Sequence, residues 1–156
     1  MRLLGFALAL SLLGCQAKPG RDPLVERAAF GVFFGGQIQD RKELPFELDT
    51  SKQSCGIRVE FREALMHPAK VSWEIARPLN EKASKHGVGA ERVTEVGEAA
   101  ARVGERRLDV PVLLRQGQAL GSWHVRVKVD ERTVIDRDVL VFDARERRLR
   151  EADAGR

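Results

Sequence analysis

The chain has 156 residues, a formal net charge of +4 and 43% hydrophobic residues. This length is typical of one domain, and the apolar content is sufficient for a core, which excludes disorder throughout. Acidic and basic residues are interleaved, as in DERTVIDRD at 130–138, and the chain contains no tyrosine. Because no stripe of one charge sign carries aromatic residues for base stacking, we do not expect the protein to bind nucleic acid.

The chain begins with the features of a secretory signal. Arg2 is followed by an almost wholly apolar segment at 3–14. Such a segment rises only about 18 Å as a helix, which is too short to cross a hydrocarbon core of about 30 Å. A positive residue followed by a short apolar run is typical of a cleaved signal peptide. The alternative, a buried N-terminal helix, is disfavoured because QAKPGRDP at 16–23 is polar and contains Pro and Gly.

The apolar segment ends in LLGC, residues 12–15. This tetrad resembles the lipobox of bacterial lipoproteins, although Leu13 is bulkier than the usual residue at its position. The resemblance implies that residues 1–14 are a signal peptide and that Cys15, acylated on its thiol, becomes the first residue of a membrane-anchored chain. Each buried CH₂ contributes about 0.8 kcal/mol, so two or three acyl chains hold a protein firmly on membrane lipid. By the same resemblance, Gln16 in place of Asp favours the outer membrane of the cell envelope. The alternative is a soluble secreted binding protein whose Cys15 is not acylated.

A tether and a series of short strands follow the signal. Residues 15–26 contain Pro and Gly, and we expect them to separate the lipid from a domain at 27–143. Alternation of apolar and polar residues, as in CGIRVEFRE at 55–63, predicts a half-buried strand. Similar patterns predict further strands at 27–36, 70–78, 92–96, 99–103 and 107–113, with a polar loop at 79–91. Pro111 places the last of these strands at a sheet edge, because proline cannot donate to a ladder.

The clearest predicted element is a β-hairpin at 121–143. In GSWHVRVKVD, Trp123 and three valines alternate with polar residues such as His124, which we expect to face solvent. DER at 130–132 turns the chain, and TVIDRDVLVF returns along the first strand. Residues 144–156 are highly charged and are expected to form a flexible tail or a short exposed helix.

These elements predict an all-β fold, an antiparallel immunoglobulin-like β-sandwich, because short strands separated by turn signals occur without a long amphipathic helix. GSWHVRVKVD also resembles the penultimate strand of bacterial immunoglobulin-like domains. Trp73 and Trp123 are then expected to fill the core between the two sheets. Cys55 has no intrachain partner if Cys15 carries lipid, so we expect it to be buried, with pairing between molecules as the alternative.

The sequence carries no pattern typical of catalysis or metal binding. His67, His86 and His124 lack the spacing and the neighbouring carboxylate of a zinc site. Neither a Gly-x-Ser-x-Gly elbow nor a phosphate-binding loop occurs. We therefore expect no catalytic residue, no metal and no cofactor. The alternative is an envelope hydrolase or carbohydrate-active enzyme, which would need a pocket combining His86 or His124 with a carboxylate and a hydroxyl.

One stretch is a candidate for partner contact. FFGGQIQDRKELPFELD at 33–49 predicts an apolar strand, two glycines and then a loop in which Gln37, Phe46 and Leu48 touch a partner. The alternative is an ordinary connection with Phe46 in the core. The predicted function is that of a non-catalytic, membrane-anchored envelope lipoprotein acting as an interaction or accessory module for a protein or glycan.

Overall fold

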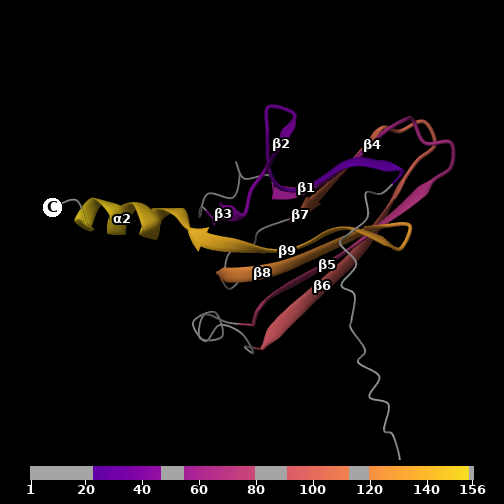
Figure 1. Cartoon of the computed structure of the whole chain (residues 1–156). Coiled ribbons are helices and arrows are strands. Elements are labelled where there is room, and N and C mark those ends of the chain that lie inside the picture. The colour runs from indigo at the N-terminus through magenta and orange to yellow at the C-terminus, as the bar shows by residue number, and fades with distance from the viewer. Residues whose placement is uncertain (1–22, 47–54, 80–90, 113–119, 155–156) are drawn as a thin grey trace, which may run out of the picture.

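The computed structural model describes residues 23–46, 55–79, 91–112 and 120–154. Most of them lie in strands, and a helix follows the last strand (Figure 1). The strands are β1 (Val25–Phe34), β2 (Gln37–Asp40), β3 (Glu43–Phe46), β4 (Cys55–Phe61), β5 (Ala69–Pro78), β6 (Arg92–Ala101), β7 (Arg107–Val112), β8 (Gly121–Val129) and β9 (Arg132–Asp143), and the helix is α2 (Ala144–Ala154).

The strands form two sheets that pack face to face. One sheet has four strands in the order β2-β1-β4-β7, and the other has five in the order β3-β9-β8-β5-β6. All neighbours are antiparallel except β3 and β9, which run parallel. The first, second and fifth strands of an immunoglobulin domain share one sheet and its third, sixth and seventh the other, and β1-β4-β7 and β5-β8-β9 match these two sets. The fold is an immunoglobulin-like β-sandwich, as predicted.

The core lies between the sheets and consists of the inward-facing residues of both. Trp123 is only 2% exposed, so its predicted place in the core is confirmed. Cys55 is buried as a free thiol, which confirms the first of its two predicted states. Other fully buried members are Phe30, Leu44, Ile57, Val59, Ile75, Val125, Val127 and Val139. Each such side chain contributes about 1.5–3 kcal/mol by leaving water, so this filled interior holds the two sheets together.

The β8–β9 hairpin turns at Asp130 and Glu131, within the predicted segment. Their φ angles are +45° and +65°, which is the left-handed pair of a two-residue type I′ turn. The Asp130 amide donates to the Lys70 carbonyl at 2.9 Å, and the Asp130 carboxylate accepts from the Lys70 amide at 2.8 Å. These bonds to β5 compensate for the unusual φ angle of a non-glycine residue.

β6 is one continuous strand, so the prediction of two strands on either side of Gly97 is wrong. Gly97 pairs with Trp73 of β5, and the indole lies over it. A Cβ at position 97 would stand 2.3 Å from Trp73 Cζ2, so only glycine leaves room for the ring. Trp73 packs against the core but stays partly exposed at this edge, and therefore does not fill the centre as Trp123 does.

The segment 37–46 is expected from the sequence to be a loop, but it contains β2 and β3. β2 and β3 belong to different sheets, and Arg137 of β9 forms hydrogen bonds that hold the connection between them in place. Arg137 faces inward opposite buried Val125, and its Nη2 donates to the Phe30 carbonyl at 3.0 Å and to the Asp40 carboxylate. This contact explains why a charged residue occupies an inward-facing position of β9.

The first strand begins before the expected start of the domain, whereas the last strand ends at Asp143, the expected end of the sandwich. β1 begins at Val25, two residues before the expected domain start, and Val25 is buried. At the other end, 144–154 form helix α2, which extends away from the sandwich (Figure 1). Asp143 Oδ1 caps α2 by accepting from the amides of Arg145 (2.7 Å) and Glu146 (3.1 Å). No helix within the described ranges is long and apolar enough to cross a membrane.

Candidate functional site

The predicted partner-binding residues do not form one site. Gln37 is exposed at the start of β2 in the four-stranded sheet, whereas Phe46 is the last residue of β3 in the five-stranded sheet. Leu48 and Cys15 lie outside the described residues, as does His86.

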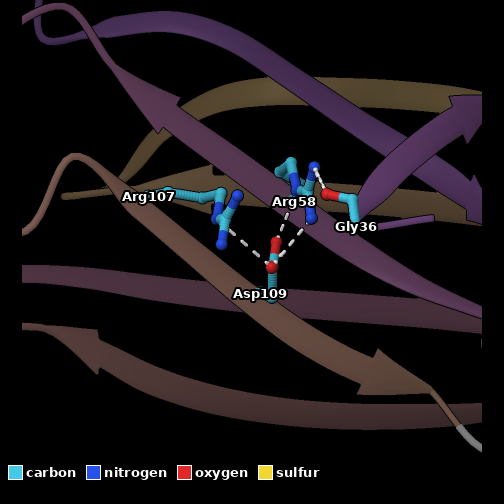
Figure 2. A network of polar contacts seen from close by, with 4 residues as sticks. All are labelled: Gly36, Arg58, Arg107 and Asp109. Carbon is cyan, nitrogen blue, oxygen red and sulfur yellow. Dashed lines mark hydrogen bonds and ion pairs between the residues drawn. The ribbon is translucent and has the colours of Figure 1, made fainter. Parts of the chain in front are cut away.

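The outer face of the four-stranded sheet carries a buried charge. Arg58 lies between Ile57 and Val59 on β4 and is only 5% exposed, so the prediction of a half-buried strand is wrong at this residue. Its Nε and Nη2 donate to the two carboxylate oxygens of Asp109 on β7, at 2.6 and 2.9 Å. Its Nη1 donates to the Gly36 carbonyl at 3.0 Å (Figure 2).

The β1–β2 hairpin covers this arginine. Gly35 and Gly36 have φ of +57° and +74°, which gives the two-residue turn that presents the Gly36 carbonyl. The Phe33 ring lies 5.3 Å from the Arg58 guanidinium carbon, as in a cation–π contact. The hydrogen bonds that Arg58 donates to Asp109 are the main reason why the pKa of Arg58 is raised above its usual value. Since Arg58 already has partners within the chain, we assign this network a structural role: it joins β4, β7 and the hairpin.

The outer face of the five-stranded sheet is different, because its charged groups are accessible. We define this outer face by the alternate residues of β5, β6, β8 and β9 that project opposite to the core. Across the hairpin, Arg126 Nε contacts Asp136 Oδ2 at 3.0 Å. Across the other side of the sheet, Lys70 Nζ lies 2.8 Å from Glu98 Oε2, and this bond lowers the pKa of Glu98 and raises that of Lys70.

His124 lies on this outer face, as predicted, between two carboxylates. Its Nε2 is 2.9 Å from Asp136 Oδ1 and its Nδ1 is 3.0 Å from Asp138 Oδ1. A catalytic histidine uses one ring nitrogen to contact an orienting carboxylate and the other to accept a proton from a nucleophile. Here both nitrogens face carboxylates, so neither is available to a hydroxyl. Nowhere in the described ranges are three or more His, Cys, Asp or Glu side chains grouped to hold a metal ion.

A shallow depression of about 460 Å³ lies on the same outer face. It is lined by residues of three neighbouring strands, namely Ser72, Trp73, Glu74, Val96, Gly97, Glu98, Arg126 and Lys128. Apart from Trp73 and Gly97, which belong to the inner-face positions of β5 and β6, the lining side chains are two cations, two carboxylates, one hydroxyl and the apolar Val96. This arrangement can form ion pairs and hydrogen bonds with a polar partner, and it is our candidate functional site.

Arg126 and Lys128 stand at polar positions of GSWHVRVKVD, but nothing in the sequence singles them out. The sequence does not reveal the order of strands in the sheet, and it is this order that places β5 and β6 next to β8. The signal available in the sequence was the run of basic residues at alternate positions of β8.

Comparison with known protein families finds no match, and neither does comparison with curated protein sequences. Among solved structures, this chain is similar to the crystal structure of an immunoglobulin-like protein from Pseudomonas aeruginosa. The alignment covers 76% of this chain and 94% of that one, with 15% sequence identity and a TM-score of 0.46.

Proposed function

We propose that this chain is a non-catalytic, lipid-anchored protein of the bacterial cell envelope whose immunoglobulin-like domain binds a protein partner. The anchor is supported by LLGC at 12–15, directly after an apolar segment of signal-peptide length. Cys15 would carry the acyl chains, and residues 16–22 would link the lipid to the sandwich that begins near β1. Gln16 supports the outer membrane as the anchored location.

The observation that carries the binding role is the depression on the outer face of the five-stranded sheet. Arg126 and Lys128 lie there beside Glu74 and Glu98, around Val96, which is 73% exposed. Charges of both signs around a small apolar centre suit a protein surface with the complementary pattern, and such charges set specificity and the association rate. The rival function, an envelope hydrolase, finds no support in His124, because its two nitrogens are occupied.

Site-specific photo-crosslinking in intact cells tests this proposal. A photoreactive residue in place of Ser72 lies in the depression, and one in place of Val103 is the matched control in an exposed turn outside it. We expect one adduct of defined mass from position 72 and none from position 103. Arg126→Glu, which alters the charge pattern of the depression, should abolish the adduct without loss of folded protein. Equal labelling at both positions, or an adduct that survives Arg126→Glu, would contradict the proposed surface.

A further inference from the structure

β6 is an edge strand of unusual length for an exposed edge. All ten of its residues pair with β5 on one side, and no strand in the described part of the chain pairs with it on the other. Figure 1 shows β6 at the border of the five-stranded sheet. The unpaired amides and carbonyls of such an edge are a template for another strand. Val96, which is 73% exposed, lies at the middle of this edge.

The sequence of β6 indicates in which register this strand could pair with the β6 strand of a second copy. In a dimer with a two-fold axis perpendicular to the sheet, the outer faces of both copies lie on the same side. Directly opposed residues then share a face, and the axis passes between the two copies of one residue. Like charges directly opposite each other are destabilising, which disfavours an axis at Glu95 or at Glu98. An axis at Gly97 is also disfavoured, because it would place the apolar Val96 of one copy opposite the charged Glu98 of the other. An axis at Val96 opposes two valines.

The register centred on Val96 also suits the remaining outer-face residues. Glu98 would stand opposite Thr94 of the second copy and diagonal to its Arg92. Diagonal neighbours of opposite charge lie within reach of long side chains, so each dimer would gain this contact twice by symmetry.

On the inner face, this register provides a partner for Glu95. An inward-pointing charge near an edge normally discourages strand addition. Here Glu95 would stand opposite Gly97 of the second copy, over which that copy's Trp73 lies. Trp73 Nε1 is 2.9 Å from the place where a Cβ of Gly97 would be, so the indole N–H is at the edge and can donate to the Glu95 carboxylate.

We propose that β6 is a self-association edge, at which a second copy of this chain adds its own β6 antiparallel and centred on Val96. The two five-stranded sheets then become one continuous sheet. The contact uses the backbone edge of β6 and requires neither an acylated Cys15 nor a partner in the depression, so it goes beyond the proposed function.

Thiol crosslinking of the full chain in its native membrane or cell extract tests the register. Val96→Cys would place two thiols opposite each other at the axis, and a short bifunctional maleimide should convert the protein to a covalent dimer. Thr94→Cys and Glu98→Cys are the matched controls on the same face. Each would stand about 14 Å from its own copy, because the two are offset by four residues along the strand. Neither alone should crosslink, whereas a mixture of the two variants should.

The unsubstituted chain provides the background from Cys15 and Cys55. Dimer from Val96→Cys and from the mixed pair, but not from either control alone, would establish the edge and its register. Equal crosslinking at all three positions would indicate random collision, and no dimer from Val96→Cys above background would exclude the contact; either result overturns the proposal.

A charge variant provides an independent measurement. Val96→Lys would place two ammonium groups at the axis and should abolish crosslinking between the Thr94→Cys and Glu98→Cys chains. Val103→Lys, at another exposed apolar residue, should leave it unchanged. Crosslinking that persists with Val96→Lys would overturn the proposed register.

Discussion

Asp109→Ala is expected to destabilise the domain more than its exposed position suggests. The substitution removes two hydrogen bonds of 2.6 and 2.9 Å from Arg58, whose guanidinium is 5% exposed and keeps its contacts with the Gly36 carbonyl and the Phe33 ring. Removing one partner of a buried ion pair costs about 3–5 kcal/mol. The Asp109 side chain is 34% exposed, so water can reach part of the vacated position. We therefore expect a loss of about 2–3 kcal/mol and a fall of roughly 6–10 °C in Tm.

Urea unfolding followed by tryptophan fluorescence measures this loss. Arg107→Ala is the control, because Arg107 is 56% exposed and its Nε lies 3.4 Å from the same carboxylate; we expect a change below about 1 kcal/mol. Arg58→Met combined with Asp109→Ala should be more stable than Asp109→Ala alone, since the unpaired buried charge is then absent. The reasoning is refuted if Asp109→Ala is no more damaging than Arg107→Ala, or if removing Arg58 gives no recovery.

Two further predictions concern Gly97 and Cys55. Gly97→Ala should cost about 1–3 kcal/mol in urea unfolding because its methyl group would overlap the Trp73 indole, and Trp73→Leu should reduce that cost; an equal cost with leucine at 73 would exclude the overlap as the cause. Burial raises the pKa of the Cys55 thiol from 9.0 to about 12 in the folded state, so its stabilising contribution is complete below pH 9 and is lost as the pH rises towards 12. The free energy of unfolding should therefore fall by about 1.4 kcal/mol more between pH 8 and pH 10 in the native chain than in Cys55→Ala, and identical pH profiles would contradict this.

Local alternation was sufficient to predict the strands that form the core. Ile57, Val59 and Phe61 alternate with charged residues, and Trp123 alternates with polar ones, so the inward face of β4 and of β8 could be read directly. Pro111 correctly placed β7 at an edge, because among the described strands β7 pairs only with β4. These features depend on neighbours in the sequence.

The features that were missed depend on contacts between distant segments. β3 contains Pro45 and pairs in parallel with β9, which local periodicity does not reveal. From the sequence alone, Arg58 is expected to face solvent, whereas in the structure Asp109 and the β1–β2 hairpin cover it. From the sequence alone, Gly97 is expected to interrupt the strand, whereas in the structure it makes room for the Trp73 indole.

The ion pairs of the β8–β9 hairpin beside the candidate site depend on an irregularity in strand register. A regular hairpin around the two-residue turn would oppose Arg126 to Ile135, but a register shift between Val127 and Lys128 opposes it to Asp136 instead. The shift brings the carboxylates of Asp136 and Asp138 to the face that carries His124, and no local signal in the sequence marked it.

The most direct test of the proposed function is the intact mass of the protein from a membrane fraction, measured beside a Cys15→Ala variant. We predict the mass of residues 15–156 plus acyl groups for the native chain, and loss of both the acyl groups and the membrane association in the variant. An unmodified mass, or a soluble product cleaved at another residue, would contradict the lipid anchor and favour a secreted binding protein.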